Sequence, residues 1–264
     1  MTKNSGSLHI FAVTVAALLL FPILSGAYIT SADEQSWAVS PGSHTAMAIV
    51  AGIAVLALAI LLTGARQSPG IQTAGWTAAA TLGLNAWLGW KDAPPLAPAL
   101  AILHAVLAPL PLAAVIVVAV LTSAGWRRGP EPAGVRGWPS LPILATSAPL
   151  LVLIQIGLGA AYRHKAAGVL PHMLGALIVT LLMMVICIAI LQNFSDHNSL
   201  RPAAMAGLWI VLAQIAIGIA AFGMRLLDFD NSPVFVVLTV AHVTNGALTL
   251  AASVVLALQV RRNC

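Results

Sequence analysis

The sequence is poor in charge: only 7% of its 264 residues are Asp, Glu, Lys or Arg, whereas 60% are hydrophobic. Soluble globular chains carry about 25% charged residues, so this composition excludes an ordinary soluble protein. The mean hydropathy of +0.97 is typical of a polytopic integral membrane protein. The net charge of +5 is not gathered into a basic cluster with interleaved aromatic residues, so nucleic acid is not an expected partner.

Cysteines and long polar segments are scarce as well. Cys187 lies inside an apolar stretch and Cys264 is the last residue, so we expect no disulfide between them. The longest connection between apolar stretches covers about residues 123–139, which is too short and too rich in Gly and Pro for a domain. Any chemistry is therefore expected to take place among membrane helices.

Eight apolar stretches are each long enough to cross a bilayer of about 30 Å as a helix. They predict an all-α polytopic membrane protein in two halves, residues 1–124 and 140–264, joined by a cytoplasmic linker over 125–139. We expect each half to be a four-helix bundle and the two bundles to be repeats. The first stretch is expected to be a retained helix rather than a signal peptide. The predicted spans are 8–29, 43–64, 73–90, 97–122, 140–161, 170–192, 202–224 and 233–259.

The basic residues predict the orientation, because cytoplasmic loops of membrane proteins are enriched in Lys and Arg. With the N-terminus inside, eight of the twelve fall on the cytoplasmic side: Lys3, Arg66, Arg127, Arg128, Arg136, Arg201, Arg261 and Arg262. The other four, Lys91, Arg163, Lys165 and Arg225, fall outside. Both termini are thus expected in the cytoplasm.

Four histidines stand on the even-numbered helices, all toward the outer ends: His44, His104, His172 and His242. Polar residues within a membrane span are costly and usually functional, and imidazole is the commonest metal ligand in proteins. Facing histidines in a four-helix bundle are a known way to hold haem iron. We therefore predict two pairs of axial ligands, His44 with His104 and His172 with His242. Four histidines that only form hydrogen bonds are the simpler alternative, and zinc is disfavoured because no Cys or carboxylate lies at helical spacing from them.

Each odd-numbered helix brings a glycine near its outer end: Gly26, Gly89, Gly159 and Gly218. These glycines are explained either by close helix packing or by a flat macrocycle that lies against them, and the two explanations are compatible.

Other polar residues have weaker claims to a role. Arg163, Lys165 and Arg225 are the outer cations best placed to pair with haem propionates. His164 is expected to face either propionates or water. His9 and His197 are expected to be solvated on the cytoplasmic side.

The chain resembles the haem A synthase family over nearly its whole length. The resemblance rests on the helix and histidine layout, on the segment Leu153–His164, and on the passage from Gly83 through Pro94 and Pro95 to His104. It implies that His172 and His242 hold an electron-carrying haem b, while His44 and His104 face the substrate haem O. The implied reaction oxidises a methyl substituent of haem O to the formyl group of haem A, for cytochrome c oxidase assembly.

The resemblance also implies a setting. The protein would lie in a bacterial plasma membrane with its haem sites toward the outer face. Its candidate partners would be haem O synthase and cytochrome oxidase, with a homo-oligomer as a further candidate.

Two departures keep other functions open. The family carries a glutamate three residues before the first histidine and an arginine directly after it, where this chain has Pro41 and Thr45. Many members also carry a cysteine pair in the first outer loop, and residues 30–43 contain none. A non-catalytic dihaem protein that transfers electrons or holds haem is the first alternative. A transporter is the second, although no broken helix with paired acids is evident.

Overall fold

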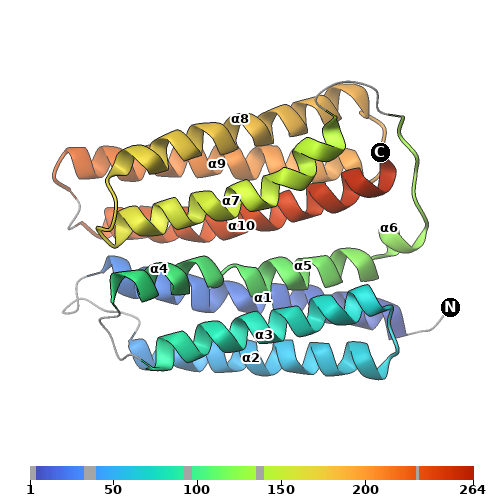
Figure 1. The fold of residues 1–264 in the computed structure, drawn as a ribbon, viewed down its shortest axis with the longest axis horizontal. Coiled ribbons are helices and arrows are strands. Elements are labelled where there is room, and N and C mark those ends of the chain that lie inside the picture. Colours follow the sequence, from blue (N-terminus) through green and yellow to red (C-terminus); the bar gives the residue numbers. More distant parts are fainter. Residues whose placement is uncertain (1–3, 33–39, 92–96, 135–139, 230–231) are drawn as a thin grey trace.

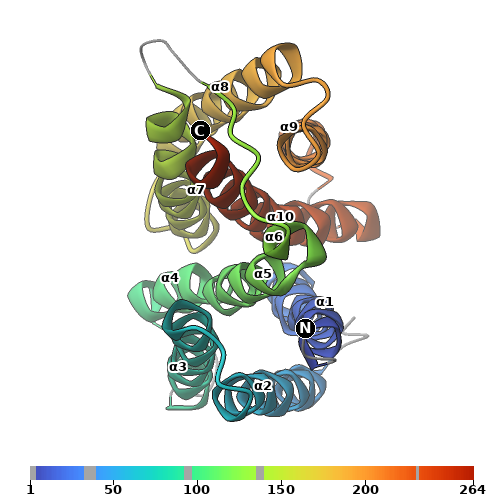
Figure 2. The same cartoon turned by 90° about the vertical axis from the view of Figure 1, so that its right-hand side faces the viewer.

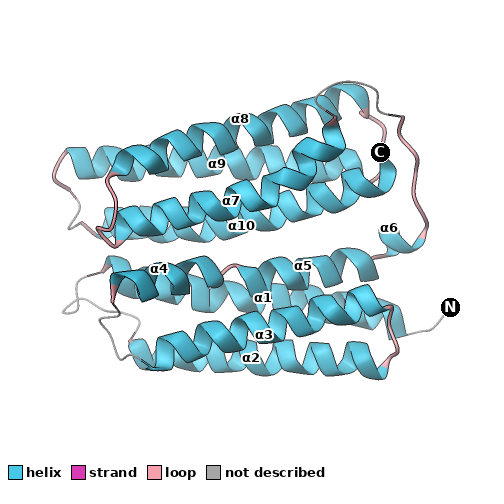
Figure 3. Cartoon of the chain, viewed as in Figure 1, coloured by secondary structure: helices cyan, strands magenta, loops and turns pink. Residues whose placement is uncertain are grey.

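The computed structural model describes residues 4–32, 40–91, 97–134, 140–229 and 232–264, and these residues form helices and connecting loops with no strand (Figure 3). The all-α prediction is confirmed for these residues. Both termini lie at one end of the molecule, as Figure 1 shows.

The first group of helices contains α1 (Asn4–Ser31), α2 (Pro41–Gly64), α3 (Pro69–Lys91), α4 (Pro98–Leu107) and α5 (Leu110–Thr122). The single helix predicted over 97–122 is interrupted at Ala108 and Pro109, between α4 and α5. Proline lacks an amide hydrogen and clashes with the preceding helical turn, which explains the interruption. Since α5 continues where α4 ends, the two still form a single stretch long enough to cross a membrane.

The second group contains α7 (Leu141–Arg163), α8 (Val169–Asn193), α9 (Leu200–Leu226) and α10 (Pro233–Asn263), and the short helix α6 (Ala124–Arg127) precedes it. Helix starts are marked by ordinary capping residues. Ser40 accepts a hydrogen bond from the amide of Ser43, and Ser232 accepts one from the amide of Phe235, each followed by a proline in the first helical turn.

The two groups pack side by side and each has its own apolar core (Figure 2). Val15, Leu58 and Val115 are fully buried in the first core, and Met183, Ile186 and Leu256 in the second. Helix α10 lies against α1 and α5, and α7 lies against α4, so the contact between the groups runs along their length.

Seven of the described helical stretches are long and apolar enough to cross a membrane, counting α4 with α5. Helix α3, at 23 residues, has the length but not the apolar character, because it carries polar residues such as Gln72, Thr73, Thr77 and Asn85. The eight predicted spans are thus matched by seven apolar ones, together with a more polar helix that packs among them in the first group.

Candidate functional site

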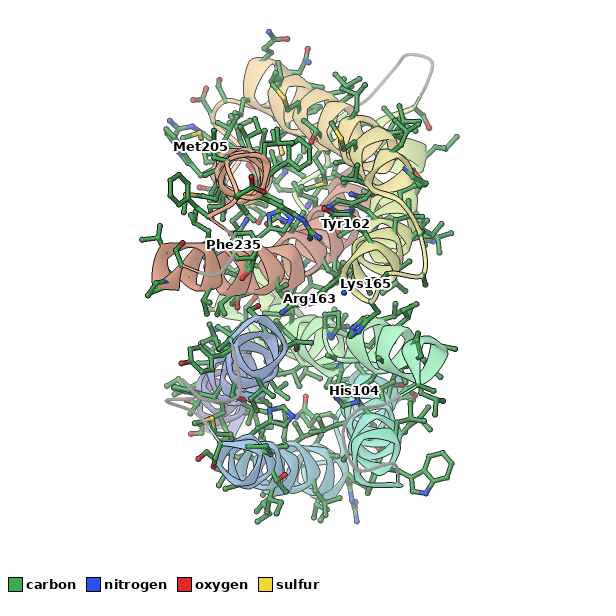
Figure 4. The ribbon with its side chains drawn as sticks, turned by 90° about the vertical axis from the view of Figure 1, so that its left-hand side faces the viewer. His104, Tyr162, Arg163, Lys165, Met205 and Phe235 are labelled. Carbon is green, nitrogen blue, oxygen red and sulfur yellow. The ribbon has the colours of Figure 1, made fainter. Side chains whose placement is uncertain are left out.

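The four predicted histidines lie near one end of the molecule, the end opposite both termini. His44 and His172 stand in the first turns of α2 and α8, His104 stands in the last turn of α4, and His242 lies three turns into α10. All four side chains are half-buried. In Figure 4, which looks onto this end, His104 points into the first helix group.

Each histidine ring packs against a glycine on the helix that precedes it in the chain. A Cβ atom built on Gly26 would lie 3.1 Å from Cε1 of His44, and one on Gly89 would lie 3.1 Å from Cε1 of His104. The matching distances are 2.9 Å from Gly159 to His172 and 2.8 Å from Gly218 to His242. A side chain at any of the four glycines would push the imidazole away. The glycines predicted to allow close packing therefore allow the close approach of the histidine rings themselves.

The same four helices hold the ring nitrogen Nδ1. In α3, the carbonyl oxygen of Asn85, four residues before Gly89, lies 3.1 Å from Nδ1 of His104. The rings of the other three histidines meet side chains of the preceding helices, those of Ser25, Gln155 and Gln214.

A carbonyl oxygen only accepts hydrogen bonds, so the contact with Asn85 places the proton of a neutral His104 on Nδ1. The other nitrogen, Nε2, then carries a lone pair that can bind a metal, and an anchored Nδ1–H is the usual arrangement in histidine ligation.

The rings of the second pair lie at a separation that two imidazole ligands of one metal ion would also have. The rings of His172 and His242 lie 6.2 Å apart between centres, with their planes 82° apart. A metal ion about 2 Å from a nitrogen of each ring implies a separation of about 6 Å between ring centres. In the first pair, His104 lies close enough to act electrostatically on His44.

Side chains beside the histidines add a polar layer. Ser25 Oγ lies 2.8 Å from Nδ1 of His44, and the Gln155 amide nitrogen lies 2.9 Å from Nδ1 of His172 and donates to the carbonyl of His172. Gln214 lies 3.3 Å from both ring nitrogens of His242 and accepts a hydrogen bond from Asn245. Ser25, Gln155 and Gln214 had no predicted role. Each lies one or four residues before a glycine that packs on a histidine, and a polar residue at that spacing is the signal that could have indicated them.

Two buried oxygen atoms in this layer have no partner among the described residues: Oδ1 of Asn85 and Oε1 of Gln155. A Cβ atom built on Gly175 would lie only 2.1 Å from that Gln155 oxygen, so the glycine makes room for the amide. Buried polar atoms are normally hydrogen-bonded, so these two oxygens are exceptions within the polar layer.

Tyr162 extends the second pair outward. Its ring stacks on His172 at 6.5 Å between centres and an interplanar angle of 10°. The exposed residue Arg225 places its guanidinium over the Tyr162 ring, 5.2 Å from the ring centre. The predicted cation Arg225 is thus held next to the second pair through an aromatic ring.

The other predicted cation, Arg163, lies between the two helix groups (Figure 4). Its guanidinium donates to the carbonyl of Ala27, at 2.8 Å, and to the hydroxyl of Ser31, both near the end of α1. Lys165 is exposed. His164 is half-buried, and burial, followed by the charge of Arg163 and then that of His104, lowers its pKa below the ordinary value.

The prediction that His9 and His197 are solvated is wrong. His197 is 8% exposed: its Nδ1 accepts hydrogen bonds from the amides of Ser199 and Leu200, and its Nε2 donates to the carbonyl of Glu131. His9 is half-buried, and its Nδ1 lies 2.9 Å from the carbonyl of Ala119. Both act as structural hydrogen-bonding residues far from the four paired histidines.

Within the described ranges, no three residues of His, Cys, Asp or Glu come together as a metal site. The four histidines come in pairs, and an iron porphyrin would need no more than two protein ligands because its own nitrogens supply the others. The fold and site define an integral membrane protein with histidines anchored in pairs at one end. Compared with family models and with curated proteins, the chain has no match in either set.

Proposed function

We propose that this protein binds haem through its paired histidines and acts as a haem A synthase-like membrane oxidoreductase. The observation that carries haem ligation is the second pair, whose rings lie 6.2 Å apart, each with its Nδ1 side held by the preceding helix. The conversion of haem O to haem A rests on the resemblance in sequence.

In this proposal His172 and His242 hold haem b, which supplies one-electron transfer when it is bound. His44 and His104 face the substrate haem O. Gly159 and Gly218 seat the second pair, and Gln155 and Gln214 orient it. Arg225, together with Arg163 and His164, lies at the end of the bundle where the acidic propionates of a haem would need partners.

The proposal includes a topology. The two helix groups are repeated four-helix bundles, α3 is the eighth span, and the polar face of α3 is accommodated by packing within its group. Both termini are cytoplasmic and the histidine end faces outward in a bacterial plasma membrane. Lipid surrounds the bundle, and haem O synthase, cytochrome oxidase or a second copy are the partners to test.

A non-catalytic dihaem electron carrier is the second candidate, and one observation favours it. Oxidation of a substrate methyl group calls for a proton acceptor, and a carboxylate near His44 is the natural one. Pro41 and Thr45 stand where the family has a glutamate and an arginine. The nearby acids Asp33 and Glu34 lie outside the described residues.

The test is a pyridine haemochrome spectrum of the purified protein after co-expression with a source of haem O. Haem A or its hydroxymethyl precursor supports the synthase, haem B alone supports the electron carrier, and protein without haem contradicts both. His172→Ala and His242→Ala should each abolish the b-type absorbance of the second pair. His9→Ala, which removes a histidine at the opposite end, is the control and should leave the spectrum unchanged.

A further inference from the structure

Three consecutive residues at the end of α7 reach toward both histidine pairs. Tyr162 stacks on His172 of the second pair. His164 caps the end of α7, and α7 packs against α4, the helix that carries His104 of the first pair. Arg163, between them, crosses from the second helix group to the first and binds the end of α1.

The contact that Arg163 makes on α1 is adjacent to the seat of His44. It binds the carbonyl of Ala27, and Ala27 follows Gly26, the glycine against which the His44 ring packs. Ala27 lies in the last turns of α1, where the helix dipole attracts a cation. Arg163 also directly follows Tyr162, whose ring stacks on His172 of the second pair. One cation therefore lies near both pairs.

The charge of Arg163 is not balanced by a carboxylate in the described part of the chain, where the sole ion pair joins His197 to Glu131 at the other end. Arg163 is also held among protein atoms between the helix groups, in contrast to the exposed Lys165 two residues later. A charge in such surroundings is less screened than one in water and acts over a longer distance.

We propose that Arg163 is a positioning residue shared by both histidine pairs, whose charge raises the reduction potential of a haem bound at either one. The inference rests on the proposed function, because it concerns haem held by these pairs. An iron that accepts an electron loses one unit of positive charge, so a fixed cation nearby favours the reduced form. The hydrogen bonds to Ala27 and Ser31 keep that cation in place and fix the part of α1 that seats His44.

The experiment is a redox titration of the purified haem-loaded protein, followed by its α-band absorbance. The two pairs are titrated separately in His44→Ala and His242→Ala backgrounds. Arg163→Gln is expected to shift the midpoint potential of both pairs downward, and Arg163→Lys, which keeps the charge, is expected to restore most of the shift. Lys165→Gln, which removes an exposed charge close in sequence, is the control and should leave both potentials unchanged.

A second variant tests the charge without removing the arginine. Ser31→Asp places a carboxylate against the guanidinium and should lower both potentials as Arg163→Gln does, whereas Ser31→Ala should not. This variant decides the question if Arg163→Gln does not fold. Unchanged potentials in the charge-altering variants, or an equal shift from Lys165→Gln, would overturn the inference while leaving haem binding intact. A parent protein without haem would overturn the proposed function, and the inference with it.

Discussion

The ring centres of His172 and His242 lie 6.2 Å apart and the ring planes are nearly perpendicular, although the whole of α9 separates the two residues in the sequence. Each ring packs against a glycine on the preceding helix, Gly159 for His172 and Gly218 for His242. One side of each ring is therefore filled by protein. The following predictions test this arrangement.

The first prediction concerns two glycines on the same helix. Gly218→Ala places a Cβ atom 2.8 Å from the His242 ring, whereas Gly223→Ala meets nothing within 4 Å. We expect Gly218→Ala to weaken haem binding by about 10–100-fold, the usual effect of disturbing what orients a metal ligand. Gly223→Ala should leave binding unchanged and stabilise α9 by about 0.5–1 kcal/mol. Titration of the apoprotein with haem measures both, and equal binding by the two variants would contradict the role of Gly218.

The second prediction concerns the amides beside the second pair. Gln155→Leu and Gln214→Leu remove the side chains that lie 2.9 Å and 3.3 Å from the ring nitrogens of His172 and His242. We expect each to weaken haem binding by about 10–100-fold and to alter the α-band, because an unanchored imidazole rotates more freely.

The matched control for the amides is Gln72→Leu, since Gln72 bonds the carbonyl of Gln67 in the first helix group, away from the second pair. Haem affinity and spectrum that stay unchanged in Gln155→Leu and Gln214→Leu would show that these amides do not anchor the rings.

The third prediction concerns the linker between the two helix groups. His197 accepts hydrogen bonds from two amides at the start of α9 and donates one to the linker residue Glu131, whose own amide donates to Asn263 at the end of α10. His197→Ala leaves the two amides of α9 without an acceptor, which costs about 1–3 kcal/mol. Thermal unfolding in detergent should show a lower Tm, with the haem spectrum of the folded protein intact.

Asn198→Ala serves as the control for His197, because Asn198 is exposed and its contact with Glu131 is 3.3 Å long. A Tm loss as large in Asn198→Ala as in His197→Ala would mean that the loop as a whole, rather than the buried imidazole, holds the linker.

The fourth prediction concerns α3, the most polar of the long helices. If it spans the membrane, positions before and after it lie on opposite sides. We expect Ser68→Cys to react with an impermeant thiol reagent from the same side as Cys264, and Ala97→Cys from the other side. Ser68, Ala97 and Cys264 are exposed, whereas Cys187 is buried and should stay unreactive. Each cysteine is tested alone in a Cys264→Ser background, and labelling of positions 68 and 97 from one side would remove α3 from the spans.

Hydropathy predicted the positions of the helices well because most of the apolar runs are long. It could not predict the interruption at Ala108 and Pro109, since a proline is tolerated in some membrane helices, as Pro22 and Pro149 are here. The histidines were found at one end because alternating helix direction fixes that end once the helices are known. Their contacts with the glycines depend on loop length and helix rotation, which the sequence pattern does not determine.

The contacts between the two groups were the least predictable. Arg163 was predicted to pair with propionates, yet its partners in the structure are the carbonyl of Ala27 and the hydroxyl of Ser31. Those contacts depend on how the groups are placed against one another. His197 was predicted to be solvated because its neighbours in the sequence are polar. In the structure, backbone groups of those polar segments hydrogen-bond the imidazole, and the side chain is buried.

Each glycine and the histidine that it seats come from two helices joined by one short connection: α1 with α2, α3 with α4, α7 with α8, and α9 with α10. A histidine can therefore be oriented as soon as its own hairpin has entered the bilayer, before the rest of the chain is made. A pair, however, requires two hairpins. During biosynthesis the first pair can be assembled once the fourth long helix has been inserted, and the second pair must wait for α10, so the order of translation also sets the order in which the two sites become able to bind.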